Sequence, residues 1–171
     1  MKFNIPYVYE NKDKINKLMK QKYKILTGDP GKQNLLVLYN PKDGKIRFTQ
    51  NNLKYGKSLK KSFKYYVNNL ILKFGRRCIL IIGDTGCNEI NKKLVEYLST
   101  RFNVFIVNEY RTSKECNACK SDLSFVNVKG KRLNRVVQCT NENCRIILNK
   151  DVNACKNIFK RFLNELQDHK Y

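Results

Sequence analysis

Four carboxylates stand where predicted strands or helices end or begin. Asp29 and Asp84 each follow a short apolar run, Glu109 closes another, and Asp151 opens the last predicted helix. Parallel strands bring their carboxyl ends to one edge of a sheet, so these side chains are expected to converge there. A group of carboxylates without thiols suits Mg²⁺ or Mn²⁺. Two such ions about 4 Å apart can activate a water and stabilise the leaving oxygen in phosphodiester hydrolysis.

Each carboxylate also has a simpler interpretation. Asp29 in GDPG and Asp84 before a Thr-Gly pair both fit turns. Glu109 is able to pair with Arg111, and Asp151 suits a helix N-terminus through the helix dipole. These alternatives stay open for single residues, whereas the joint placement favours a metal site. The single histidine lies near the C-terminal end, which argues against histidine-based acid–base chemistry.

Four of the seven cysteines have the spacing of a zinc site. Cys116 and Cys119 form a C-x2-C pair, and Cys139 and Cys144 form a C-x4-C pair. Two such pairs on two knuckles place four thiolates around one structural Zn²⁺. The alternative, four free or buried thiols, is less consistent with this spacing.

The remaining cysteines are expected to be structural. Cys155 lies on the apolar stripe of the last predicted helix, and Cys78 and Cys87 have no partner at ligand spacing. The N-terminus lacks the apolar core of a secretory signal, and no apolar run is long enough to cross a bilayer. We therefore expect an intracellular, reducing compartment, with nucleus and cytoplasm both open.

The charge of the chain predicts a polyanionic partner. It contains 35 Lys and Arg residues against 14 Asp and Glu residues, a formal net charge of +21. Nucleic acid fits this excess best. A membrane surface fits less well, because the basic residues are spread over several elements. An A/T-rich genome, viral or protist, would explain part of the lysine count but not the shortage of acids.

The first half of the chain predicts an antiparallel meander. A strand through Ile25 and Leu26 is expected to enter a tight turn at Gly28–Gly31. Asn34–Asn40 and Lys45–Gln50 read as the next two strands, joined by a turn at Pro41–Gly44.

Helical and fully apolar segments follow. In three segments, apolar residues recur every three or four positions, which predicts helices. Two other segments are short apolar runs typical of buried parallel strands. The predicted helices are Ser58–Phe74, Glu89–Thr100 and Lys150–Leu166, the last with Asn149 as N-cap, and the predicted strands are Cys78–Asp84 and Asn103–Glu109. This order predicts an α/β, ribonuclease H-like fold: a mixed five-stranded sheet with flanking helices and an inserted four-cysteine zinc finger.

The length of 171 residues fits one core plus a small metal-bound insert. We expect a basic N-terminal segment at 1–23, with a weak helical tendency around Lys14–Met19. The nuclease-like domain is expected to comprise 24–112 and 148–171, and the zinc finger 113–147.

Three blocks of sequence carry a family resemblance. GDPGKQNL, NEYRTSKECNAC and NKDVNACKNI resemble the signature blocks of the RuvC-type nuclease of TnpB transposon proteins. They look closest to the eukaryotic and viral relatives called Fanzor, and more distantly like type V CRISPR effectors. The resemblance runs from about Ile25 to Ile158.

The resemblance implies an RNA-guided, metal-dependent DNA endonuclease with Mg²⁺ or Mn²⁺ at its centre and a structural Zn²⁺. Asp29 matches the first catalytic aspartate and Asp151 the last. Glu109 matches the shifted catalytic glutamate of Fanzor-like members, with Asp84 in reserve. Cys116, Cys119, Cys139 and Cys144 match the zinc ligands. The expected nucleic-acid contacts are Lys32, Arg111, Lys114 and Lys150.

The chain also departs from the family pattern. Lys150 replaces an arginine before the last aspartate, and Arg145 replaces a glycine after the fourth cysteine. The large N-terminal domains that grip guide RNA and target DNA have almost no counterpart here, so a partner chain would have to supply them. The alternatives are therefore an active nuclease half, a zinc-stapled DNA- or RNA-binding remnant without useful cleavage, and an unproductive relic. The oligomeric state stays open.

Overall fold

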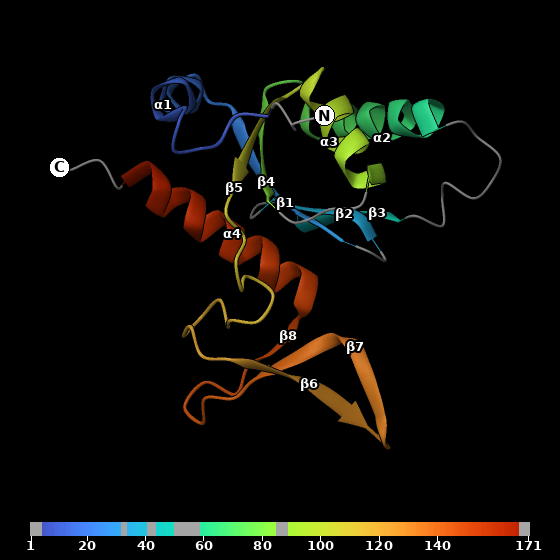
Figure 1. Cartoon of the computed structure of the whole chain (residues 1–171), viewed down its shortest axis with the longest axis vertical. Coiled ribbons are helices and arrows are strands. Elements are labelled where there is room, and N and C mark those ends of the chain that lie inside the picture. The colour runs from blue at the N-terminus through green and yellow to red at the C-terminus, as the bar shows by residue number, and fades with distance from the viewer. Residues whose placement is uncertain (1–4, 32–33, 41–43, 50–58, 85–88, 168–171) are drawn as a thin grey trace.

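A computed structural model describes residues 5–31, 34–40, 44–49, 59–84 and 89–167 (Figure 1). Within these ranges the chain forms two sheets and four helices. In chain order the elements are α1 (Lys12–Lys20), β1 (Lys24–Pro30), β2 (Asn34–Asn40), β3 (Gly44–Thr49), α2 (Leu59–Phe74), β4 (Cys78–Gly83), α3 (Glu89–Ser99), β5 (Asn103–Val107), β6 (Leu123–Val128), β7 (Lys131–Cys139), β8 (Ile147–Asn149) and α4 (Lys150–Gln167). None of the helices in the described ranges is long and apolar enough to cross a membrane.

The larger sheet has the strand order β3-β2-β1-β4-β5. β1 pairs antiparallel with β2 and parallel with β4, and β4 pairs parallel with β5. This mixed five-stranded sheet confirms the predicted ribonuclease H-like fold class. Parallel pairing turns the carboxyl ends of β1, β4 and β5 toward the same edge, where the carboxylates of interest lie.

Two of the boundaries that differ from the sequence prediction lie beside the carboxylates. β1 does not turn at Gly28, because its pairing with β2 continues through Asp29 opposite Val37 and through Pro30 opposite Leu36. β5 ends at Val107, so Glu109 lies beyond the strand rather than in its last position. The predicted turn at 41–44 falls mostly outside the described residues, as does Cys87.

Helices cover both faces of this sheet. On one face, α2 and α3 pack against side chains from β1, β2, β4 and β5. On the other, α1 and α4 pack against β4 and β5, with Phe105 and Phe162 at most 1% exposed. The amphipathic spacing explains this arrangement, since the residues that recur every three or four positions in α2 are the ones it buries.

The approach of α4 to the sheet is close. The Thr27 hydroxyl donates to the carbonyl of Cys155 at 3.0 Å, and the Cys155 thiol donates to the carbonyl of Val37 at 3.3 Å. Cys155 is fully buried, as expected of a structural thiol. On the opposite face of β1, a Cβ at Gly28 would lie 2.6 Å from Ile82 Cδ1 and 2.9 Å from Leu38 Cδ2. A side chain at this position would have to push these packed core groups aside.

The N-terminal segment lines the free edge of β5. Tyr7 forms a parallel bridge with Ile106, the amide of Ile106 donates to the carbonyl of Pro6, and the amide of Val8 donates to the carbonyl of Ile106. The weak helical tendency around Lys14–Met19 corresponds to α1. The edge of the parallel half of the sheet is thereby covered in part.

The second sheet has the order β6-β7-β8 and lies apart from the larger one, below it in Figure 1. β6 and β7 form an antiparallel hairpin between the two cysteine pairs. The amide of Val152 donates to the Asn149 side chain at 3.2 Å, which confirms Asn149 as the N-cap of α4. Since α4 starts at β8 and crosses the larger sheet, it joins the two parts.

Candidate metal centre

An open pocket lies at the carboxyl edge of the larger sheet. Its volume is about 660 Å³. Three of the four predicted carboxylates line it: Asp29 from β1, Asp84 directly after β4 and Glu109 just beyond β5. The rest of its lining comes from the segment that follows β5: Asn108, Tyr110, Arg111, Thr112, Ser113 and Lys114.

Asp151 joins this group from the first turn of α4. The pKa of Asp29 is raised to about 7, mainly by burial and secondly by the negative charge of Asp151, while the positive charge of Lys150 lowers it. The two aspartates therefore lie close enough to repel one another. A buried carboxyl with an acidic neighbour holds its proton until a cation compensates the charge.

Glu109 is the second buried acid of the pocket. Its pKa is raised to about 8, mainly by burial and then by repulsion from Asp29 and Asp84, while the positive charge of Arg161 lowers it. Its Oε2 is buried without a hydrogen-bond partner among the described residues. A Cβ at Gly83 would stand 2.0 Å from that oxygen, so the glycine leaves the space that the carboxylate occupies.

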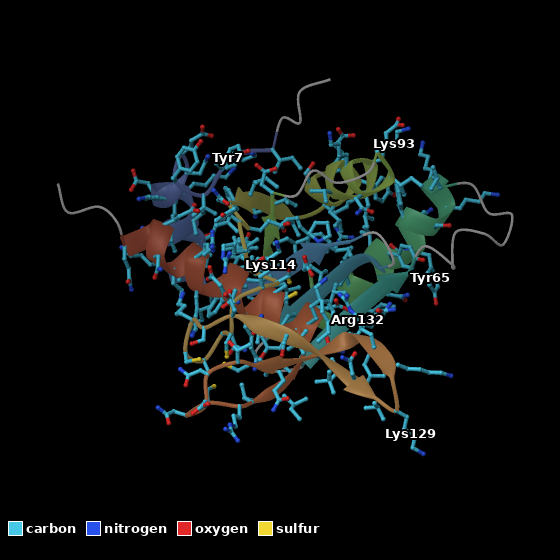
Figure 2. The ribbon with its side chains drawn as sticks, turned by 60° about the horizontal axis from the view of Figure 1, so that its bottom comes forward. Tyr7, Tyr65, Lys93, Lys114, Lys129 and Arg132 are labelled. Atoms are coloured by element: carbon cyan, nitrogen blue, oxygen red, sulfur yellow. The ribbon has the colours of Figure 1, made fainter. Side chains whose placement is uncertain are left out.

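Asp84 differs from the other acids of the pocket because it is exposed. The Tyr7 hydroxyl donates to Asp84 Oδ2 at 2.5 Å. This hydrogen bond is also the main reason why the pKa of Tyr7 is raised to about 12. Tyr7, labelled in Figure 2, reaches Asp84 from the segment along the β5 edge. Nothing in the local sequence around Tyr7 indicates this contact across 77 residues.

The donor set fits a hard divalent cation in its chemistry. It offers buried carboxylates that repel one another and one buried oxygen without a partner, and a cation would relieve both costs. The carboxylate oxygens of the pocket are farther apart than the ligand atoms of a site that already surrounds a metal ion. Within the described residues, the four cysteines are the one group of potential ligands whose donor atoms all lie within 4.8 Å of one another.

The four cysteines predicted to bind zinc come together. Cys116 Sγ lies 3.9 Å from Cys144 Sγ, and Cys119 Sγ lies 3.3 Å from Cys139 Sγ. The pKa of Cys119 is lowered to about 6, mainly by hydrogen bonds from Ser121, and that of Cys139 is raised to about 12, mainly by burial. Four thiols in this arrangement can bind a tetrahedral Zn²⁺.

The predicted basic contacts have different surroundings. Lys114 lines the pocket, and Lys150 lies near Asp29. Arg111 lines the pocket too, but it forms ion pairs with Glu115 at 3.3 Å and with Asp122. Lys32 lies outside the described residues.

The β6–β7 hairpin forms a further basic surface. None of the nucleic-acid contacts predicted from the sequence lies on it. Figure 2 shows Lys129 at its tip and Arg132 on β7. The guanidinium of Arg132 stands 3.5 Å from the centre of the Phe125 ring.

Comparison with known proteins agrees with this architecture. Residues 92–158 match the family described as Cas12f1-like, TNB domain. Among solved structures, the chain is similar to one described as the Cas12f1-sgRNA-target DNA complex, with a TM-score of 0.54 and 15% sequence identity. That match covers 79% of this chain and 49% of the other, so the chain spans about half the length of the protein it resembles. No curated protein matches. The domain match over residues 92–158 and the similar fold agree with the resemblance to type V CRISPR effectors that the three sequence blocks predict.

Proposed function

We propose that the chain is the nuclease part of a TnpB-type, RNA-guided DNA endonuclease. The observation that carries the proposal is the convergence of Asp29, Asp84 and Glu109 from three neighbouring strands on one pocket, with Asp151 beside Asp29. The solved structure it resembles contains a guide RNA and a target DNA. By extension, DNA is the proposed substrate and guide RNA the proposed partner, with the remaining gripping surfaces supplied by other chains or segments.

Asp29, Glu109 and Asp151 would hold Mg²⁺ or Mn²⁺. Burial, mutual repulsion and the partnerless Glu109 Oε2 support this assignment over the exposed, tyrosine-bonded Asp84, which stays in reserve. Bound divalent cations supply the positive charge that makes water a better nucleophile and stabilises the leaving oxygen of a phosphodiester.

The chain's own residues prepare the pocket for a polyanion. Lys114 lines the pocket, and Lys150 lies beside Asp29. Both can contact the phosphates on either side of the scissile bond. Tyr7 orients Asp84 by donating to its carboxylate. Cys116, Cys119, Cys139 and Cys144 are proposed to hold one Zn²⁺, which folds the finger that adjoins the pocket segment.

A second candidate is a nucleic-acid-binding module without cleavage. The β6–β7 hairpin favours it, because Lys129 and the Arg132–Phe125 pair present positive charge and an aromatic ring away from the pocket. Such a module would bind with a steep salt dependence and would tolerate the loss of any carboxylate.

A cleavage assay separates the two candidates. The zinc-loaded chain is incubated with labelled single- and double-stranded DNA and Mg²⁺ or Mn²⁺, beside Asp151→Asn and the matched control Asp13→Asn on α1, which is exposed and away from the pocket. The nuclease proposal expects metal-dependent cleavage that Asp151→Asn abolishes and Asp13→Asn retains. Binding without cleavage, in the presence of guide RNA as well, would favour the second candidate.

A further inference from the structure

The segment between Glu109 and the first zinc knuckle lies along one face of α4. This face carries Asn153 and Asn157, one helical turn apart. Both lie on the side of α4 opposite the apolar residues that face the larger sheet, yet both are buried, at 0% and 3% exposure. Buried amides are costly unless their hydrogen bonds are satisfied, so their partners indicate what they do.

The two asparagines hold the same pair of backbone carbonyls. Asn153 Nδ2 donates to the carbonyl of Thr112 at 3.2 Å and to that of Glu115 at 2.8 Å. Asn157 Nδ2 donates to both of these carbonyls as well, at 2.8 Å each. Four donations from one helix face therefore fix the middle of the segment.

The same face also holds the two ends of the segment. Asn153 Oδ1 accepts from the amide and from the side chain of Asn117, at 2.9 Å each. Lys160 donates to the carbonyl of Asn117, and Arg161 donates to the carbonyls of Asn108 and Tyr110. The segment 108–117 is thus attached to α4 over its whole length, and it contains Glu109 at one end and Cys116 at the other.

We propose that Asn153 and Asn157 are positioning residues that couple the cysteine cluster to the carboxylate pocket. When the cysteines hold zinc, Cys116 fixes the knuckle, the asparagines fix the segment on α4, and Glu109 is held beside Asp29. The same helix carries Asp151 in its first turn. The contact between α4 and the segment 108–117, called the clamp below, therefore fixes the positions of Glu109 and Asp151 relative to each other. The consequence for metal binding at the pocket rests on the proposed function, whereas the mechanical coupling does not.

Amide hydrogen exchange tests the coupling without any metal in the pocket. Exchange of residues 108–115 is compared with and without zinc in the wild-type chain, in Asn153→Asp and in Cys155→Ala. Asn153→Asp removes two amide donors and places a carboxylate against two carbonyls. Cys155→Ala is the control, because it changes a fully buried residue of the same helix that donates to Val37 instead.

We expect zinc to slow exchange across 108–115 in the wild type and in Cys155→Ala, and to slow it far less in Asn153→Asp. Zinc-dependent protection that stays within the finger, or that persists in Asn153→Asp, would overturn the proposal. Should Asn153→Asp fail to load zinc, Asn157→Ala serves in its place, because Asn153 still holds both carbonyls there. This variant is expected to lose part of the protection.

Mn²⁺ binding then extends the test to the pocket. With zinc bound, Asn153→Asp is expected to lower the Mn²⁺ affinity about 5-fold or more, and the exposed α1 variant Asp13→Asn to leave it within about 2-fold. An unchanged Mn²⁺ affinity in Asn153→Asp would contradict the coupling. Wild-type protein that binds no Mn²⁺ would refute the proposed function instead, and the exchange result would still decide whether the clamp couples the two regions.

Discussion

Raising the pH should destabilise the zinc-loaded chain in the absence of divalent metal, and Mg²⁺ should reverse the effect. The pKa of Asp29 is raised to about 7 and that of Glu109 to about 8, in both cases mainly by burial. In the unfolded chain both groups ionise near their ordinary values, around pH 4. Between about pH 4 and pH 8 the folded state therefore binds more protons than the unfolded state, so the free energy of unfolding falls as the pH rises.

The size of the effect follows from the two shifts. Each pKa unit corresponds to about 1.4 kcal/mol. Between about pH 6 and pH 8 the unfolded state is already ionised, whereas the folded state must release protons from both acids, which costs roughly 2 to 4 kcal/mol in total. Repulsion from Asp29 is part of the Glu109 shift, so the two costs are not independent and their sum lies toward the lower part of this range.

Urea denaturation, followed by circular dichroism, measures this dependence. The free energy of unfolding is determined at several pH values with zinc bound, with and without millimolar Mg²⁺. In Glu109→Gln, which has no proton to lose, the fall between about pH 6 and pH 8 should shrink by about half or more. A stability that stays constant or rises with pH, or an equal fall in Glu109→Gln, would refute the assignment of these two buried acids.

Three further changes have distinct expected outcomes. Gly83→Ala places a Cβ 2.0 Å from Glu109 Oε2, so it should displace this flexible carboxylate and lower Mn²⁺ affinity about 10-fold or more while the fold is retained, as circular dichroism and titration will show. Gly28→Ala should instead cost about 1–3 kcal/mol of stability in urea denaturation, because its Cβ meets packed core atoms of Ile82 and Leu38. Cys116→Ala should abolish the tetrahedral thiolate spectrum of the Co²⁺-loaded chain and unfold the finger, and an unchanged spectrum would remove Cys116 from the ligand set.

The parts of the fold that could be predicted are those set by local pattern. Apolar runs without alternation indicated β4 and β5 as buried parallel strands, and three- or four-residue spacing indicated α2 and α4. The cysteine spacing likewise predicted a cluster whose sulfur atoms do converge. The turn expected at Gly28 was wrong, because pairing with β2 outweighs the local turn preference of GDPG.

The contacts that position the site could not be predicted in this way. The Tyr7–Asp84 hydrogen bond joins segments far apart in the chain, and only the folded sheet edge brings them together. Asn153 and Asn157 left no signal in the sequence either, because they lie on the side of α4 opposite its apolar stripe, where the pattern alone predicts solvent exposure. The partners themselves are backbone carbonyls of another segment, which no side-chain pattern indicates.

The most direct test of the central claim is Mn²⁺ titration of the zinc-loaded chain, followed by electron paramagnetic resonance of the free ion. We predict saturable Mn²⁺ binding that Asp29→Asn and Asp151→Asn each weaken strongly, and that Asp13→Asn leaves unchanged. Binding that is absent in the wild type, or that persists in Asp29→Asn, would contradict the assignment of a divalent-metal centre to this pocket.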